Sequence, residues 1–454
     1  MRHFFRYFFV LSALTLSLSI TAQTTQWRDI YKAKKKDTIY GIAQKYNITL
    51  DELKEANPEM KKADYQLKKG DFVFIPFEKT KADIEAEKNK PVMPVRSDIQ
   101  QRAIRVGVML PLHNVDGDGR RMVEYYRGLL MACDSLRRQG ISTDVRAWNV
   151  AIDSDIRETL LQEGASQCDI IFGPLYTKQV KPLANFCKTY DIRMVIPFSI
   201  SGDDVEQYPQ IFQVYQSGVW QNQAMINAFV ERFPNHHAVF IDCNDSTSRK
   251  GSFTMALRKQ LDESKITYNV TNLKTPDDAF SKAFNRSKPN VVILNTGRSP
   301  ELNQTLAKLN ILRQRDAGVA ITLFGYTDWL LYTEPYGDYF HRYDTYIPTN
   351  FYYNAQSRAT QQLEQNYKQW FKEEMLFALP HFALTGYDHG QFFLRGLHQY
   401  GTAFRGTKDQ RVKAALQTPL YFKPVSKTGG MQNSHFMLVH YKPNKTIEAI
   451  NYYG

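Results

Sequence analysis

A regular alternation of short apolar strands and amphipathic helices over most of the chain is the feature that most constrains its fold. Apolar runs at residues 104–108, 169–172 and 291–294 are each followed by a segment whose apolar residues recur at helical spacing. Repeated strand–helix units produce parallel sheets that helices cover on both faces. Because the roughly 350 residues involved exceed what one such sheet normally holds, the sequence predicts an α/β region with two lobes.

The rhythm of strands and helices restarts at Trp220, which predicts that the chain passes there from one lobe to the other. We expect three crossovers, near residues 213–217, 325–330 and 429–433. Lobe one would then hold residues 102–213 and 330–428, and lobe two would hold residues 217–325 and a last strand at 436–440. A cleft between the lobes follows from this arrangement.

A separate small unit at residues 26–77 has the order strand, helix, helix, strand. Asp37 stands where the cap of a first helix is expected, and Thr49 with Glu52 forms the capping-box pattern of a second helix. Pro58 ends that helix, and Gly70 turns the chain into an apolar strand at residues 72–76. The sequence therefore predicts a compact βααβ module.

This module resembles a LysM domain along its whole length. The resemblance is carried by Asp37-Thr38-Ile39, Ile42-Ala43, Tyr46-Asn47-Ile48, Leu53, Ala56-Asn57-Pro58, Leu67, Lys69-Gly70 and Ile75-Pro76. It implies binding of peptidoglycan, a glycan that contains N-acetylglucosamine, by two loops that hold Asp37, Thr38, Ile39, Asn57, Pro58 and Glu59. Alternatively, Asp37 and Asn57 only cap helices. Lys36 departs from the usual Gly of the pattern, which bears on affinity rather than on fold.

The chain's N-terminal segment has the order of a secretory signal. Arg2 and Arg6 precede an apolar run that ends at Ala22, and no Cys follows that could carry a lipid. We expect a signal over residues 1–22, cleavage near Ala22, and an exported protein of the periplasm or cell envelope without a transmembrane segment. The alternative is an uncleaved anchor. Residues 78–101, rich in Lys and Glu with Pro91 and Pro94, predict a solvated linker before the large region of residues 102–454.

The large region resembles the type I periplasmic-binding-protein family, in particular its amino-acid receptor branch. The motifs are Ile104 to Pro111, Tyr126-Arg127-Gly128, Asp169 to Pro174, Ile196-Pro197, Gly386-Tyr387-Asp388 and Phe436 to Val439. In this family a ligand lies between the lobes, where free N–H groups at helix N-termini attract carboxylates. The matching positions are Tyr176, Thr177, Ser199, Ser201, Tyr215 and Tyr326. Because no acidic residue is evident for an amine, we expect weak or no binding of free amino acids.

Enzymatic, metal and nucleic-acid functions find little support. The chain has no HExxH, GxSxG or GxxxxGK[ST] motif, so we expect no catalytic site, metal or cofactor. The net charge is +12, but 58 basic residues are interleaved with 46 acidic ones, which does not favour nucleic-acid binding. A Cys168–Cys187 bridge is feasible, while the alternative is four buried free thiols: Cys133, Cys168, Cys187 and Cys243.

Three functions are compatible with these features. The first is an adaptor or regulator that holds peptidoglycan and presents the bilobal domain to an envelope protein, as binding-protein-like folds do in some activators of peptidoglycan synthesis. The second is a receptor for an amino-acid-like small molecule. The third, a cell-wall hydrolase, is the weakest because no catalytic constellation accompanies the LysM-like module.

Overall fold

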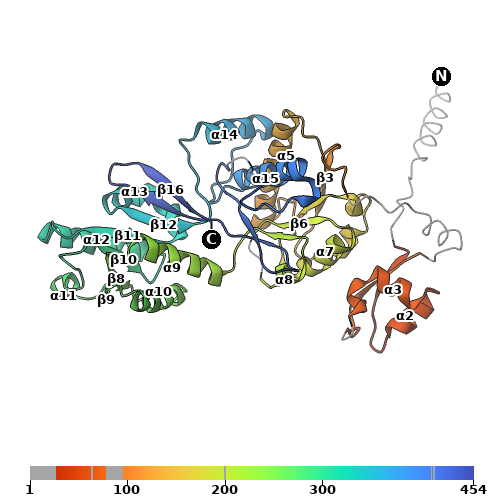
Figure 1. Cartoon of the computed structure of the whole chain (residues 1–454), viewed down its shortest axis with the longest axis horizontal. Coiled ribbons are helices and arrows are strands. Elements are labelled where there is room, and N and C mark those ends of the chain that lie inside the picture. The colour runs from red at the N-terminus through yellow and green to blue at the C-terminus, as the bar shows by residue number, and fades with distance from the viewer. Residues whose placement is uncertain are drawn as a thin grey trace, which may run out of the picture.

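The computed structural model describes residues 27–62, 65–77, 96–198, 201–410, 412 and 415–453. An N-terminal module, residues 27–77, lies beside a larger region that contains two seven-stranded sheets (Figure 1). Each of these two sheets, with its helices, is one lobe. Of the helices in the described part of the chain, none is both long enough and apolar enough to span a bilayer. The predicted signal at residues 1–22 lies outside the described residues.

The N-terminal module has the predicted order of elements, with one short addition. Strands β1 (Asp29–Lys32) and β2 (Phe72–Ile75) pair antiparallel, and helices α2 (Ile39–Lys45) and α3 (Leu50–Ala56) lie between them in sequence, followed by the 3-10 turn η1 (Pro58–Lys61). The cap of α2 is Thr38 rather than Asp37, since the Thr38 side chain accepts a hydrogen bond from the Gly41 N–H. The predicted capping box of Thr49 and Glu52 is present on α3.

This module buries a hydrophobic core of its own. The core residues come from both helices, from the loop between them, from η1 and from β2: Ile42, Ala43, Ile48, Leu53, Met60, Val73 and Ile75. Because β2 alternates between inward and outward side chains, Val73 and Ile75 enter this core while Phe72 and Phe74 lie on the opposite face of the sheet. The outer face of the two-stranded sheet is therefore aromatic.

Lobe one contains the sheet β13-β14-β7-β6-β5-β3-β4, whose strands are parallel except for the pair β13–β14. Its strands are β3 (Ile104–Leu110), β4 (Thr143–Asn149), β5 (Ile170–Phe172), β6 (Arg193–Ile196), β7 (Ile211–Gln213), β13 (Phe422–Pro424) and β14 (Met431–Asn433). Its helices are α5 (Gly117–Arg137), α6 (Ile156–Leu160), α7 (Thr177–Thr189), α8 (Asp204–Gln207), α14 (Arg358–Phe371) and α15 (Phe382–Tyr400), with the 3-10 turns η2 (Ala165–Gln167) and η4 (Gly401–Ala403).

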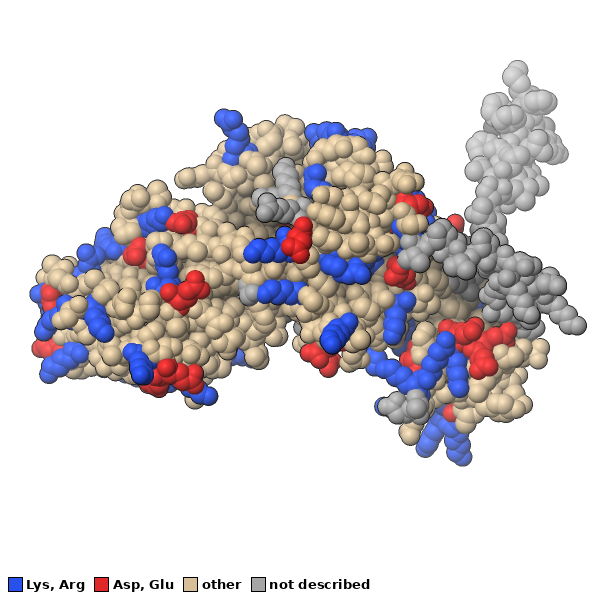
Figure 2. Space-filling model, viewed as in Figure 1, with Lys and Arg blue, Asp and Glu red and all other residues tan. Residues whose placement is uncertain are grey.

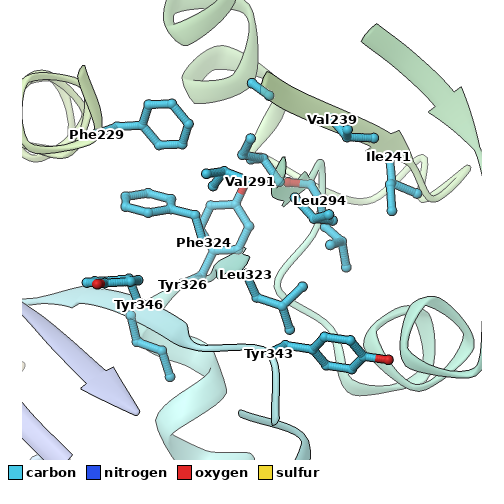
Figure 3. Packing of buried hydrophobic residues seen from close by; sticks show 14 of the residues in the cluster. Phe229, Val239, Ile241, Val291, Leu294, Leu323, Phe324, Tyr326, Tyr343 and Tyr346 are labelled. Atoms are coloured by element: carbon cyan, nitrogen blue, oxygen red, sulfur yellow. Dashed lines mark hydrogen bonds between the residues drawn. The ribbon is translucent and has the colours of Figure 1, made fainter. Parts of the chain in front are cut away.

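Lobe two contains the sheet β16-β15-β12-β11-β10-β8-β9, with a parallel centre and an antiparallel edge. Its strands are β8 (His237–Asp242), β9 (Tyr268–Asn272), β10 (Asn290–Leu294), β11 (Ile321–Phe324), β12 (Thr345–Thr349), β15 (Phe436–Tyr441) and β16 (Ile447–Tyr452). Its helices are α9 (Gly218–Arg232), α10 (Gly251–Glu263), α11 (Asp277–Ser281), α12 (Ser299–Arg315) and α13 (Thr333–Arg342), with the turn η3 (Thr327–Tyr332). Figure 3 shows part of its core, where the rings of Phe229 and Phe324 pack 5.1 Å apart.

The chain crosses between the lobes three times, and one predicted crossover was wrong. The first follows β7 and the third lies between β14 and β15, both close to the predicted positions. The second was expected near residues 325–330, but β12 still pairs with β11 in lobe two, so the chain leaves that lobe only after Thr349. Pro348 lies inside β12, and a proline weakens the sequence signal of a strand.

The end of the predicted linker is part of lobe one. Ile99 is fully buried, and the guanidinium groups of Arg96, Arg102 and Arg105 all bond the buried carboxylate of Asp169 at the start of β5. These bonds outweigh the cost of burial and hold the pKa of Asp169 well below its usual range. The folded domain therefore begins at about residue 96, before the predicted boundary at 102.

The cysteines are free thiols, and the basic side chains at the surface are interleaved with acidic ones. Cys133, Cys168, Cys187 and Cys243 are all free and buried, and burial raises the pKa of the Cys133 thiol to about 11. The feasible Cys168–Cys187 bridge is absent from the described structure. Figure 2 shows acidic and basic side chains interspersed over the viewed face of the two lobes.

Candidate binding sites

The loop from β1 to α2 holds the first three predicted glycan-binding residues. The Asp37 carboxylate accepts hydrogen bonds from the Lys34 N–H (2.7 Å) and the Tyr31 hydroxyl (2.8 Å), and these bonds lower its pKa. Thr38 caps α2, and Ile39 is half-buried against the core of the module. The Asp37 and Thr38 side chains thus shape this loop, and the exposed surface beside them is formed mainly by Lys34, Lys35 and Lys36.

Lys36 takes a backbone conformation that explains the glycine usual at this position. Its φ is +79°, in the left-handed region where a side chain costs about 1–2 kcal/mol and glycine costs little. Lys36 therefore adopts, with some strain, the backbone conformation that glycine adopts easily. The sequence departure affects stability locally and leaves the βααβ order intact.

The loop after α3 holds the other three predicted residues, and the side chain of one of them is used entirely in hydrogen bonds that stabilise the fold. Asn57 is fully buried: its amide donates to the main-chain oxygens of Leu53 and Phe74 and accepts from the Phe74 N–H, each at 2.8 Å. Asn57 ties the end of α3 to β2, and the residue as a whole is buried, so it offers no surface to a glycan. Pro58 and Glu59 are half-exposed on η1.

The carboxyl ends of the strands of both lobes face the junction between the lobes. The chain leaves lobe one after β7 and leaves lobe two after β12, in each case at a strand's carboxyl end. In open α/β sheets this is the edge where ligands bind, because helix N-termini gather there. The predicted cleft residues follow strands of lobe one at this edge, except Tyr326, which follows β11 of lobe two.

Three of the predicted cleft residues come together, and a fourth group joins them. The Thr177 hydroxyl at the start of α7 accepts a hydrogen bond from the Ser201 N–H at 3.3 Å. The neighbouring Tyr176 hydroxyl donates to the Asp118 carboxylate at 3.3 Å, and burial, assisted by Asp118, raises the pKa of Tyr176 to about 12. Asp118 also lies 3.4 Å from Arg121. This edge of lobe one carries hydroxyls and a carboxylate that is already paired.

Comparison with protein families follows the same division of the chain. The family described as "Periplasmic binding protein" matches residues 148–435, which is more than half of the chain. The chain belongs to the periplasmic binding protein family. The N-terminal module matches the LysM domain over residues 31–76. Among curated proteins, none matches this sequence significantly.

Solved structures share the binding-protein fold at low sequence identity. A putative branched-chain amino acid ABC transporter from Rhodospirillum rubrum is 14% identical with a TM-score of 0.53, covering 77% of this chain and 100% of that one. An ABC transporter substrate-binding protein from Sphaerobacter thermophilus is 13% identical with a TM-score of 0.46, covering 77% and 96%. Full-length LpoA from Haemophilus influenzae is 13% identical with a TM-score of 0.49, covering 77% and 59%. The first of these likenesses shows the fold alone.

The remaining cleft residues of this periplasmic binding protein are more buried than expected. Tyr215 packs beside Phe198 (ring centroids 6.2 Å apart), and burial raises its pKa to about 12. The prediction for Tyr326 does not fit its placement: the side chain is 2% exposed and its hydroxyl donates to the Leu294 oxygen within the core of lobe two (Figure 3). Tyr326 is a packing residue of the lobe-two core. Ser199 lies outside the described residues.

Lobe two presents a polar network at its strand ends that the sequence did not reveal. The Asp245 carboxylate accepts from the Thr247 and Thr296 hydroxyls at 2.6 and 2.7 Å and lies 3.5 Å from the Arg298 guanidinium. These hydrogen bonds, led by that of Thr247, lower the pKa of Asp245 to about 2. Asp328 pairs with Lys250 at 2.8 Å. The only sequence signal for this network was that its residues come soon after strands: Asp245 closely follows β8, and Thr296 closely follows β10.

The two domains are of binding type. Within the part of the chain that the structure describes, no group of three or more His, Cys, Asp or Glu side chains is arranged to hold a metal ion. Asp116 caps α5 by accepting from the Gly119 N–H. A LysM domain supports binding of peptidoglycan, and the bilobal domain supports binding of a ligand or partner. Both fit an exported protein of the cell envelope.

Proposed function

We propose that this protein is a non-catalytic adaptor or regulator of the cell wall. Its LysM domain holds peptidoglycan, and its bilobal domain is presented to an envelope partner. The proposal includes export to the periplasm or cell envelope, with a signal removed near Ala22. The observation that carries it is the joining, in one chain, of a LysM domain with its own core to a complete bilobal binding domain.

The pairing of the cleft carboxylates favours an adaptor over an amino-acid receptor. An α-amine needs an acidic partner, and a carboxylate that already has a cation beside it attracts a second cation less, because the two cations repel each other. Asp118 lies beside Arg121, Asp245 lies beside Arg298, and Asp328 pairs with Lys250. A wall-attached protein is also poorly suited to shuttling a ligand to a transporter.

Co-sedimentation with purified peptidoglycan sacculi tests the tether, by which we mean the binding of peptidoglycan by the LysM domain. We expect residues 23–454 and the isolated module of residues 26–77 to pellet with sacculi, and residues 96–454 to stay in the supernatant. Retention of residues 96–454 alone, or loss of residues 26–77 to the supernatant, would contradict the tether. Full-length protein should also release no soluble fragments from sacculi, and release would favour the hydrolase alternative.

The structure suggests which side chains to change in the module. Asp37, Thr38 and Asn57 hold loops, caps and strands together, so substitutions there are expected to lower stability as well as binding. Ile39→Ala with Glu59→Ala changes partly exposed side chains of the two predicted loops instead. We expect this double variant to pellet less than wild type, while Gln44→Ala, an exposed change on α2, pellets like wild type.

A second candidate function is that of a receptor for an amino-acid-like small molecule. The observation in its favour is that Tyr176, Thr177 and Ser201 share one edge of lobe one with Asp118. This function would require a ligand that binds the closed form of the two lobes better than the open form. Ligand screening separates it from the adaptor function.

A further inference from the structure

A cavity of about 380 Å³ lies between the LysM domain and lobe one. On the LysM side its walls come from the outer face of the two-stranded sheet and from the loop after α3, with Trp27, Phe72, Phe74, Pro58 and Glu59. On the lobe-one side they come largely from α7, which lies beside the LysM domain in Figure 1, with Lys178, Lys181, Asn185, Phe186 and Tyr190. The cavity therefore belongs to neither domain alone.

Aromatic rings form both walls of the cavity. Trp27 and Phe74 pack 5.4 Å apart on the LysM sheet, and Phe186 and Tyr190 pack 4.7 Å apart on α7. The Arg157 guanidinium of α6 lies 5.4 Å from the Phe72 ring and bridges the two domains. Outward-facing aromatic rings that border an unfilled space offer flat apolar surface for a ring-shaped ligand.

Cationic groups stand next to these aromatic walls. Lys178 and Lys181 are exposed one helical turn apart on α7, and neither forms an ion pair with another described residue. Figure 2 shows basic side chains gathered where the LysM domain meets lobe one. On the acidic side, Asp71 accepts from the Lys68 N–H at 2.8 Å, and Glu59 can accept from a ligand hydroxyl. Apolar rings beside unpaired ammonium groups match a ligand that combines a ring with a carboxylate.

We propose that this cavity is a second peptidoglycan site, which binds a muropeptide: an amino-sugar ring against the aromatic walls, with a stem-peptide carboxylate on Lys178 and Lys181. The cavity volume lies within the range of about 300–1,000 Å³ typical of small-molecule sites. Pro58 and Glu59 belong both to the predicted glycan loops and to this cavity, so the site extends the LysM groove onto lobe one. The inference rests on the proposed peptidoglycan binding and adds the recognition of peptide by the bilobal domain.

Calorimetric titration of the full mature chain tests this site with two soluble probes. One is a disaccharide muropeptide that carries its stem peptide, and the other is an N-acetylglucosamine oligomer of similar length without carboxylates. We expect wild type to prefer the muropeptide. Lys178→Glu with Lys181→Glu should weaken muropeptide binding by about tenfold or more, as loss of charge-assisted bonds predicts, and should leave oligomer binding unchanged. Trp27→Ala should weaken the binding of both probes.

A matched double charge reversal provides the control. Lys259→Glu with Lys427→Glu changes exposed lysines away from the cavity and should bind both probes like wild type. Equal muropeptide affinity for wild type and the Lys178/Lys181 variant, or a wild type that pellets with sacculi but does not bind the soluble muropeptide, would overturn the cavity proposal while leaving the tether intact. Failure of wild type to pellet with sacculi would overturn both.

Discussion

Lys36 shows how one residue can depart from a family pattern without changing the fold. Its positive φ places the side chain in a strained region, at a position where glycine is free of that strain. We expect Lys36→Gly to raise the stability of the isolated module by about 1 kcal/mol, measured by thermal unfolding followed by circular dichroism. Lys35→Gly, the neighbouring exposed control, should lower it instead. Equal destabilisation by both changes would show that the turn gains nothing from glycine.

We expect His435 to make the bilobal domain sensitive to acid. It is fully buried at the third crossover, and its Nε2 lies 2.8 Å from the Asn451 amide oxygen. Burial lowers its pKa to about 4, below the ordinary value near 6.5. The unfolded chain therefore binds more protons between these two values, so stability is full above pH 6.5 and falls as the pH drops towards 4.

Replacement of His435 tests this pH dependence. Gln can still donate to Asn451 but does not titrate, so the loss of unfolding free energy between pH 7.5 and pH 5 should be about 2 kcal/mol smaller in His435→Gln. Urea unfolding at the two pH values measures it. His398→Gln, a change at a partly exposed site on α15, should keep the pH dependence of wild type. An unchanged pH dependence in His435→Gln would rule out this residue as the cause.

Among the elements, the segment before β3 is anchored to β5 by a single buried carboxylate. Asp169 receives three guanidinium groups, and its loss would leave three cations together around a buried site. We expect Asp169→Asn to destabilise the domain by about 3–5 kcal/mol, the usual cost of breaking a buried ion pair. The midpoint of urea unfolding measures this loss.

Asp98 provides the matched control for that prediction. It bonds Arg102 alone, and its side chain is 58% exposed. Asp98→Asn should therefore change the unfolding free energy by less than about 1 kcal/mol, as is usual for exposed pairs. If both changes gave similar small effects, the three arginines would hold this segment without Asp169.

Strong periodic elements were predictable from sequence, and elements with mixed signals were not. Strands at residues 104–110, 290–294 and 436–441 are mostly apolar and almost entirely buried, so their patterns identified them. The strand β12 was missed because Pro348 interrupts it, and the second crossover was misplaced as a result. Its position depends on pairing with β15, nearly a hundred residues later, which no local pattern contains.

The candidate sites were predictable only to the level of loops. The family patterns led to Asp37 in the loop before α2, and to Thr177 and Ser201 beyond the ends of β5 and β6. They did not show that the Asn57 side chain would be hydrogen-bonded to β2, or that the Tyr326 side chain would be buried in the core of lobe two. Both outcomes depend on partners that are distant in sequence. The cavity walls were missed for the same reason, because each wall lies on a different domain.

At the scale of the whole molecule, the two domains contribute surfaces of different chemistry. The LysM domain and α7 border an aromatic cavity whose lysines form no ion pair with another residue that the structure describes, whereas the junction of the lobes carries acids that are paired with cations. With these two surfaces, the protein can bind peptidoglycan at its LysM end. Its bilobal domain stays available for another partner.

The pairing at the lobe junction predicts how the protein responds to free amino acids. Binding raises the unfolding temperature in proportion to the logarithm of ligand concentration over Kd. An amine that approaches Asp118 or Asp328 is repelled by the cation already beside that carboxylate, Arg121 or Lys250, and so gains little. We therefore expect each standard amino acid, at about 1 mM, to shift the midpoint by less than about 1 °C in a thermal-shift screen of the mature chain. Strong stabilisation by one amino acid, lost in Asp118→Asn but kept in Asp98→Asn, would place the receptor function above the adaptor function.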